Sequence, residues 1–220
     1  ALEAMNRPVA PTVRADGYTQ DRASTWVTDA VGALPGELVV DVCAAPGGKA
    51  TGMAASGATV IAADLVAHRV DLVVENAARL GSDVHAVRAD ATSPPLRNRS
   101  ADRVLVDAPC SGLGVMHRRP DLRWRSQPLP ELQLELLRAA AGRVRPGGTI
   151  VHSVCTVNRD EAEAVVAEIQ ASGGEAVVNH GSVTDWATTE AMVAQAVDTY
   201  GDLHIVVNNA GILRDKMSFN

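Results

Sequence analysis

Two cysteines stand at positions where covalent chemistry is possible. Cys110 follows the apolar run 104–106 in the segment Asp107-Ala108-Pro109-Cys110-Ser111-Gly112, and Cys155 follows the run 149–151. Each thiol is therefore expected at the C-terminal tip of a strand. A thiolate is a strong nucleophile, so these two residues form a candidate pair for covalent catalysis.

The segment after the first expected strand consists of small and turn-forming residues. It reads Cys43-Ala44-Ala45-Pro46-Gly47-Gly48-Lys49. Small residues at a strand-to-helix turn let the backbone approach a ligand closely. The spacing matches neither the G-x-G-x-x-G fingerprint of dinucleotide sites nor a phosphate-binding P-loop. A plain tight turn is the alternative interpretation, but so many of these residues in succession favour a ligand site.

Two aspartates follow the next two expected strands. Asp64 ends one strand, and Asp90 follows the other in Arg88-Ala89-Asp90-Ala91. An acid at the first position can accept hydrogen bonds from both ribose hydroxyls, and one at the second can accept from an adenine amino group. Either acid alone would more often be a solvated loop residue or a helix cap. Together, at successive strand ends, they favour an adenosine ligand.

The elements that must position these residues alternate between β-rich runs and helical patterns. The expected strands are 38–42, 59–63, 84–88, 103–106 and 149–153, and the expected helices are 21–33, 49–55, 67–80 and 131–144. Strands that alternate with helices predict an α/β fold, with a mostly parallel sheet and helices on both faces. Ligands in such sheets bind beyond the strand C-termini, where the strand order reverses.

Composition agrees with such a sheet. The chain has 220 residues, of which 46% are hydrophobic and 3% aromatic, so the core must consist mainly of aliphatic side chains. Three cysteines do not form a disulfide framework, and no apolar run approaches the roughly 18–20 residues that span a membrane. No signal peptide is visible. We therefore expect a cytoplasmic protein without membrane contact or a metal site.

Charge is unevenly distributed. The net charge of −6 argues against a nucleic-acid protein if the chain is taken whole, but the acidic excess lies after residue 158. Several arginines are expected around the Cys110 loop: Arg97, Arg99, Arg103, Arg118, Arg119, Arg123 and Arg125. A basic rim beside a reactive site suits a polyanionic substrate. A bias towards arginine codons explains the same residues equally well, because Lys49 and Lys216 are the two lysines of the chain.

Three motifs occur in the order found in one enzyme family. They are Asp-Val-Cys-Ala-Ala-Pro-Gly-Gly-Lys at 41–49, Asp-Ala-Pro-Cys-Ser-Gly-Leu-Gly at 107–114 and Ser-Val-Cys-Thr at 153–156, with further matches at Tyr18, Gln20-Asp21, Ser24 and 118–124. Over about residues 16–160 the chain resembles the Sun (Fmu) family of S-adenosylmethionine-dependent RNA cytosine-5 methyltransferases. The resemblance implies a Rossmann-like catalytic domain over 1–160, S-adenosylmethionine as cofactor and RNA, ribosomal RNA in particular, as partner.

The resemblance also implies roles for the reactive residues. Cys155 would be the nucleophile, Cys110 would assist release of the methylated base, and Asp107 would contact the base near N3. A thiolate that adds to carbon 6 of cytosine makes carbon 5 able to attack a methyl group, and the base must leave its stack to reach the pocket. In the DNA cytosine methyltransferase pattern the cysteine after proline is the nucleophile, which would exchange the two cysteine roles.

The same resemblance implies a cofactor site. The segment from Cys43 to Lys49 would line the methionine and ribose side, Asp64 would hold the ribose and Asp90 the adenine edge. Asp107 would also border the cofactor.

The expected strand order supports a shared crevice. The strands that end at residues 42, 106 and 153 are expected to be neighbours, so Cys43, Cys110 and Cys155 should converge. Adjacent strands lie about 4.8 Å apart, which lets two of the thiols share one base. Cys43 fits a small buried hydrophobe better and is not expected to be catalytic.

The sequence changes character after about residue 160. Helices are expected over 161–171 and 185–199, and strands over 176–179 and 203–207. Residues 162–220 resemble short-chain dehydrogenases, notably at Asn208-Asn209-Ala210-Gly211, but the glycine-rich turn and the Tyr-x-x-x-Lys pair of that family are missing. We expect residues 161–220 to pack on or complete the same sheet. The alternative functions are an NAD(P)-dependent oxidoreductase fragment and a catalytically inactive chimera.

Overall fold

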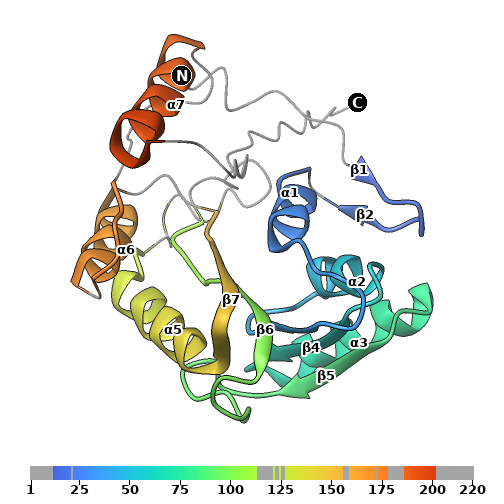
Figure 1. Ribbon diagram of the computed structural model, residues 1–220. Coiled ribbons are helices and arrows are strands. Elements are labelled where there is room, and N and C mark those ends of the chain that lie inside the picture. The colour runs from blue at the N-terminus through green and yellow to red at the C-terminus, as the bar shows by residue number, and fades with distance from the viewer. Residues whose placement is uncertain are drawn as a thin grey trace.

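Five parallel strands form the central sheet of the protein (Figure 1). The computed structural model describes residues 12–20, 22–112, 121, 124, 127–155, 159–171, 173–177 and 186–201. The strands are β3 (Leu38–Asp41), β4 (Thr59–Asp64), β5 (Val84–Arg88), β6 (Ala101–Asp107) and β7 (Val144–Ser153). Their order across the sheet is β5-β4-β3-β6-β7. The predicted α/β fold with a parallel sheet is therefore confirmed.

The strand order reverses beside β3. From β3 the chain continues to β4 on one side of the sheet and later returns to β6 on the other side. In register, Asp41 pairs with Leu105, and Asp107 pairs with Ser153 of β7. The ends of β3, β6 and β7 thus lie side by side, as the sequence predicts. The crevice for a ligand is expected at this edge.

Helices cover both faces of the sheet (Figure 1). One face carries α1 (Arg22–Val31), α2 (Gly48–Ala54) and α3 (Ala67–Leu80), and the other carries α5 (Pro130–Arg143). Two further helices are α6 (Arg159–Ala171), which packs against α5, and α7 (Trp186–Tyr200). Among the described residues, no helix is both long and apolar enough to cross a membrane.

Alternating strand residues build an aliphatic core layer on each face. Strand side chains on the α1–α3 face are Val39, Val60, Ala62 and Leu105, packed against Val27, Val31, Met53 and Val73. Strand side chains on the α5 face are Val40, Val42, Val104 and Val106, packed against Leu136 and Ala140. Because the strands are buried on both faces, they read as continuous apolar runs.

A short hairpin before α1 was not predicted from the sequence. It consists of β1 (Thr12–Val13) and β2 (Thr19–Gln20), which pair in antiparallel register. Asp16 and Gly17 lie in its turn, and Gly17 has a φ of 79°, a left-handed conformation that glycine adopts without strain. The Asp-Gly pair between two short β-rich runs was the available signal.

The segment after residue 160 is described in part. Of the strand expected over 176–179, residues 176 and 177 have no regular structure, and the rest lies outside the described residues. The strand expected over 203–207 also lies outside them. The two expected helices correspond to α6 and α7. Arg138 of α5 bonds both carboxylate oxygens of Glu168 of α6 at 2.7 Å, so an exposed ion pair joins the two helices.

Candidate active site

The two reactive cysteines meet at the edge where the strand order reverses. The Sγ atoms of Cys110 and Cys155 lie 3.3 Å apart, although 45 positions separate the residues in sequence. The backbone N–H of Cys155 also donates to Cys110 Sγ at 3.2 Å. Cys155 is exposed and Cys110 is half-buried, and neither forms a disulfide. A ligand at this edge can therefore contact both sulfur atoms.

The contact with Cys110 changes the proton affinity of Cys155. The hydrogen bond with Cys110 is the largest cause that raises the pKa of Cys155, and burial and the Cys110 and Asp107 charges raise it further. Cys155 therefore binds its proton more tightly than an isolated thiol does. The Cys155 amide N–H points at Cys110 Sγ, and a hydrogen-bond donor there favours negative charge on that sulfur.

An ion pair lies beside the sulfur atoms. Lys49, in the first turn of α2, donates from Nζ to Asp107 Oδ2 at 2.7 Å, with both side chains largely shielded from solvent. Burial acts to lower the pKa of Lys49, but the Asp107 carboxylate outweighs it and the net shift is upward. Lys49 therefore stays charged, and the pair can offset charge that develops on a ligand beside it.

Asp41 is a site residue that the sequence analysis did not single out. It ends β3, its side chain is 1% exposed, and its Oδ1 accepts from the Cys43 N–H at 3.3 Å. Its Oδ2 is buried without a hydrogen-bond partner among the described residues. Burial, followed by the Asp107 charge, raises the pKa of Asp41 to about 7. A buried carboxylate oxygen without a donor can accept from a ligand group.

The turn after β3 has the backbone freedom that its composition predicts. Gly47 has a φ of 98°, and a Cβ there would lie 3.2 Å from the Cα of Val73 in α3. The helix α2 begins directly afterwards at Gly48. Cys43 is half-buried, and burial raises its pKa to about 12, followed by the Asp41 charge. Its thiol is therefore protonated, in agreement with a packing role.

The two predicted nucleoside acids have different surroundings. Asp64 is buried at the end of β4; its Oδ2 lies 3.1 Å from Arg69 Nε, and its Oδ1 accepts from the Val66 N–H at 3.2 Å. Asp90 is exposed beyond β5, and its Oδ1 accepts from the hydroxyl and the backbone N–H of Thr92. These two hydrogen bonds lower the pKa of Asp90. Both acids lie at the edge of the sheet that carries the cysteines.

The loop that carries Cys110 is held by residues outside its own motif. The N–H of Ala108 donates to the Ser153 carbonyl at 2.9 Å, which ties the loop to β7. Gln133 of α5 is fully buried and donates from Nε2 to the Pro109 carbonyl at 3.1 Å. Gln133 carried no signal in the sequence, because the contact joins positions 24 residues apart.

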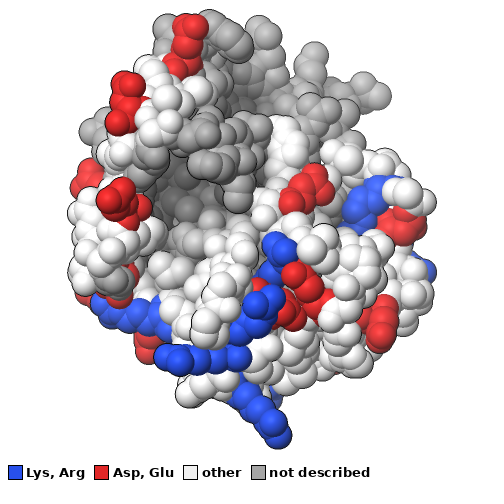
Figure 2. Space-filling view, in the orientation of Figure 1, with Lys and Arg blue, Asp and Glu red and all other residues white. Residues whose placement is uncertain are grey.

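The expected basic rim around Cys110 is wrong for three of its arginines. Arg97, Arg99 and Arg103 lie at the beginning of β6, whereas Cys110 follows its end. Seven strand residues separate these ends by about 20 Å. In the view of Figure 2, basic side chains lie across the lower part of the molecule, over the beginnings of β6 and β7. The other four, Arg118, Arg119, Arg123 and Arg125, lie outside the described residues.

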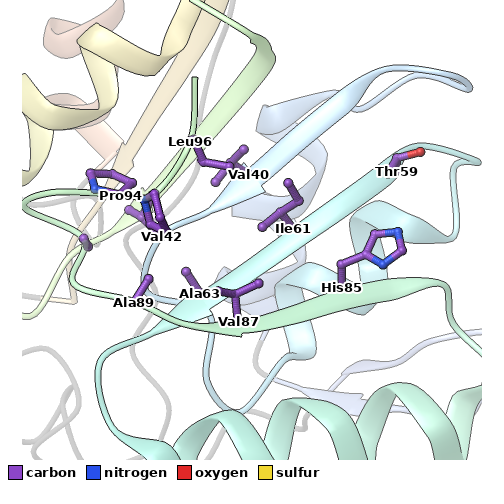
Figure 3. Close-up of a pocket in the computed structure, with 12 residues that line it drawn as sticks. Val40, Val42, Thr59, Ile61, Ala63, His85, Val87, Ala89, Pro94 and Leu96 are labelled. Atoms are coloured by element: carbon purple, nitrogen blue, oxygen red, sulfur yellow. The ribbon is translucent and has the colours of Figure 1, made fainter. Parts of the chain in front are cut away.

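A cavity of about 310 Å³ opens on the α5 face of β3, β4 and β5 (Figure 3). Residues 89–100, which connect β5 to β6, contain no helix, so α5 covers β6 and β7 but not this part of the sheet. The lining is aliphatic, with Val42, Ile61, Val87 and Leu96 prominent and His85 at one end. The cavity lining includes none of the predicted catalytic residues.

Comparisons with known proteins agree with this geometry. A family profile described as 16S rRNA methyltransferase RsmB/F matches residues 31–201. The probable ribosomal RNA small subunit methyltransferase B of Bacillus subtilis is 42% identical over 158 residues, 67% of this chain and 35% of that protein. The ribosomal RNA small subunit methyltransferase B of Thermus thermophilus is 42% identical over 153 residues, 67% of this chain and 38% of that protein. The chain thus spans about a third of the length of these curated relatives.

Solved structures give the same result. The crystal structure of NSun6 from Pyrococcus horikoshii with SFG has a TM-score of 0.64 and 33% identity, covering 75% of this chain and 45% of that chain. A methyltransferase homologue from Pyrococcus horikoshii has a TM-score of 0.57 and 28% identity, covering 70% of this chain and 51% of that chain. The matched family segment also extends over α6 and α7, and thus over most of the region for which a dehydrogenase fragment was expected from the sequence.

Proposed function

Because the chain belongs to the 16S rRNA methyltransferase RsmB/F family, we propose that it transfers a methyl group from S-adenosylmethionine to carbon 5 of a cytosine in RNA. The observation that carries the proposal is the 3.3 Å contact between the sulfur atoms of Cys110 and Cys155 beside the Lys49–Asp107 ion pair. Two converging thiols and a neighbouring charge pair suit a reaction that makes and then breaks a sulfur–carbon bond.

The residues at the end of β3 and β4 fit S-adenosylmethionine. The unpartnered Oδ2 of Asp41 is an acceptor for the ammonium group of its methionine part, and the Asp64 carboxylate is an acceptor for its ribose hydroxyls. Asp90 lies where the adenine edge is expected. A related structure holds the S-adenosylmethionine analogue SFG, which supports this assignment. The cofactor supplies an electrophilic methyl group on a sulfonium sulfur.

The chain's own residues carry out the steps on the base. Cys155 Sγ adds to carbon 6 while its proton passes to Cys110 in its thiolate form, whose sulfur already faces it. Lys49 and Asp107 bind the polar edge of the base and offset the charge that develops during the addition. With S-adenosylmethionine bound, carbon 5 would take its methyl group. Cys110 would then release the first proton to water and accept the proton of carbon 5, while the Sγ–carbon 6 bond breaks and Cys155 leaves as a thiolate.

Nucleoside analysis tests the reaction directly. The protein is incubated with ribosomal RNA fragments and S-adenosylmethionine carrying a labelled methyl group, and the RNA is digested to nucleosides. We expect the label in 5-methylcytidine. Label in another nucleoside would contradict the cytosine-5 assignment while leaving methyl transfer intact. Label in no nucleoside, with cofactor binding retained, would favour the inactive chimera.

A second candidate follows from the dehydrogenase resemblance of residues 162–220. It predicts binding of a nicotinamide dinucleotide rather than S-adenosylmethionine. The turn after β3 lacks the dinucleotide spacing, and the family match through residue 201 favours the methyltransferase. Parallel calorimetric titrations with S-adenosylmethionine and with NAD distinguish the two. Binding of NAD with no binding of S-adenosylmethionine would overturn the proposed function.

A further inference from the structure

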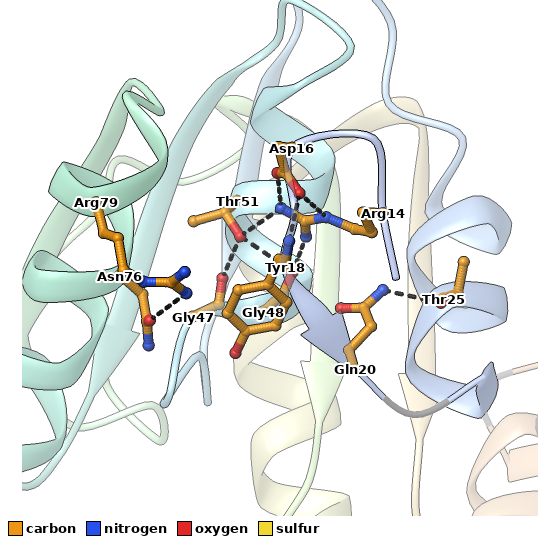
Figure 4. Close-up of polar contacts among 10 residues, drawn as sticks. All are labelled: Arg14, Asp16, Tyr18, Gln20, Thr25, Gly47, Gly48, Thr51, Asn76 and Arg79. Atoms are coloured by element: carbon orange, nitrogen blue, oxygen red, sulfur yellow. Dashed lines mark hydrogen bonds and ion pairs between the residues drawn. The ribbon is translucent and has the colours of Figure 1, made fainter. Parts of the chain in front are cut away.

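The β1–β2 hairpin docks on the turn that would carry the cofactor (Figure 4). Arg14 donates to the Gly48 carbonyl at 2.5 Å and to Thr51 Oγ1 at 3.1 Å, across more than thirty positions of sequence. The same guanidinium is paired with Asp16 at the tip of the hairpin. One half-buried arginine therefore joins the hairpin to the first turn of α2.

Tyr18 covers Gly48 from the same side. A Cβ on Gly48 would lie 2.8 Å from the Tyr18 ring, so the ring contacts the backbone of the turn directly. The ring is also bordered by two guanidinium groups, with Arg14 at 4.9 Å and Arg79 of α3 at 5.6 Å from its centre. These cation–π contacts hold the ring against the turn.

Side chains of α3 hold the opposite side of the turn. Asn76 donates from Nδ2 to the Pro46 carbonyl at 2.9 Å. Arg79 donates to Asn76 Oδ1 at 3.0 Å, as Figure 4 shows. Arg79 therefore contacts both Tyr18 and the residue that bonds Pro46. The peptide planes around Pro46 and Gly48 are fixed by side chains from two other elements, before any ligand is present.

We propose that Arg14 and Tyr18 are positioning residues, which raise affinity for the adenosyl cofactor by holding the 45–48 turn in its binding conformation. This inference rests on the proposed function and deepens it. Arg14 and Tyr18 contact the turn and its neighbours, namely Gly48, Thr51, Asp16 and Arg79. They would therefore affect cofactor binding through the conformation of the turn. A turn that is ordered in advance does not lose conformational entropy when the ligand binds.

The test compares conservative and truncating variants by calorimetric titration with S-adenosylmethionine. Tyr18→Phe keeps the ring and should bind within twofold of the unmodified chain. Tyr18→Ala and Arg14→Ala free the turn and should bind about tenfold more weakly. Arg103→Ala is the matched control, because Arg103 also joins distant segments, bonding Glu37 and the Val31 carbonyl at the opposite edge of the sheet.

Hydrogen exchange of the ligand-free protein supplies a readout that does not depend on the reaction. The Gly47 and Thr51 amides donate to the Ala44 and Gly47 carbonyls, so they report the order of the turn. We expect faster exchange at these amides in Tyr18→Ala and Arg14→Ala, and unchanged exchange there in Arg103→Ala.

The outcomes distinguish failure of the proposed function from failure of the positioning role of Arg14 and Tyr18. If the unmodified chain does not bind S-adenosylmethionine, the proposed function fails, and unchanged exchange at Gly47 and Thr51 in both alanine variants would overturn the positioning role as well. If the chain binds but folded Tyr18→Ala and Arg14→Ala bind equally well, the positioning role is overturned alone. Equal weakening in Tyr18→Phe and Tyr18→Ala would also overturn it, because it would indicate a direct contact of the Tyr18 hydroxyl.

Discussion

At the scale of single residues, the contact between Cys110 and Cys155 makes their roles separable by experiment. If Cys155 forms the bond to carbon 6, Cys155→Ser cannot form it, because a hydroxyl is far less ionised than a thiol. Cys110→Ser should still form the bond but release it slowly. A denaturing gel after incubation with S-adenosylmethionine and ribosomal RNA fragments should show a shifted band for Cys110→Ser and none for Cys155→Ser.

The opposite pattern has a physical basis in the same contact. The Cys155 amide N–H points at Cys110 Sγ, and this donor favours negative charge on Cys110. A shifted band for Cys155→Ser alone would therefore assign the nucleophile to Cys110, as in the DNA enzymes. Arg103→Ala is the control, because Arg103 bonds the Val31 carbonyl at the opposite ends of the strands, and it should behave like the unmodified chain.

Asp41 predicts a pH dependence of stability with a definite sign. Its pKa is raised from 3.8 to about 7 by burial, so between these pH values the folded chain holds a proton that the unfolded chain has released. The free energy of unfolding therefore falls as pH rises, by about 1.4 kcal/mol for each pH unit. Asp41→Asn removes this dependence. Its melting temperature should exceed that of the unmodified chain increasingly as pH rises from 5 to 8.

Asp102 provides a control of opposite sign. Hydrogen bonds from the Leu38 N–H and from Arg145 lower its pKa, so its contribution is complete above pH 4 and lost on acidification below that. Asp102→Asn should shift the melting temperature by a constant amount between pH 5 and 8. A constant shift for Asp41→Asn as well would show that the Asp41 carboxyl titrates normally.

At the scale of elements, the turn between β3 and α2 depends on Gly47 for two reasons. Its φ of 98° disfavours any side chain, and a Cβ would lie 3.2 Å from the Val73 Cα. Gly36 has a similar φ of 81° but open space around it. Gly36→Ala should cost about 1 kcal/mol of unfolding free energy from backbone strain alone, and Gly47→Ala about 2 kcal/mol or more. Urea unfolding of both variants measures the difference, and equal costs would exclude the steric effect.

Most elements could be predicted from the sequence because each is a local pattern with clear ends. Strand β3 was expected over 38–42 and spans Leu38–Asp41, and α3 matches its expected range. Strand β7 begins at Val144, earlier than the expected residue 149. The expectation was late because Pro146-Gly147-Gly148 is a typical turn sequence. The register of β7 against β6 is irregular between Ala101 and Arg103, and such an irregularity in an outer strand accommodates proline.

The candidate site was predictable only where its residues carry a motif. Cys110, Cys155 and Lys49 stand in motifs and converge in the structure. Asp41 and Gln133 gain their importance from burial and from partners far along the chain, which local patterns do not encode. The position of Arg97, Arg99 and Arg103 was predicted wrongly for the same reason. They are close to Cys110 in sequence, but the length of β6 separates them from it in the structure.

At the scale of the whole molecule, α6 joins the sheet layer through α5. Arg138 and Glu168 form a two-bond ion pair between these helices, and α6 packs along α5. Removal of residues 162–220 deletes most of α6, so the melting temperature should fall. Arg138→Ala is the matched control and should lower it by less, because an exposed ion pair contributes little. If the shortened chain melts at the same temperature, the C-terminal region is a passive tail.

The sheet separates two sets of interactions along the strand direction. The cysteines and acids lie beyond the strand C-termini. At the N-terminal ends of the strands, Arg103 bonds Glu37 and Asp102 accepts from the Leu38 N–H. Substitutions this far apart contribute independently to stability. Stabilising substitutions at the N-terminal ends of the strands can therefore offset destabilising ones at the C-terminal ends, where the cysteines lie. Because of this spatial separation, residues at the strand C-termini can be substituted while the contacts at the strand N-termini keep the scaffold folded.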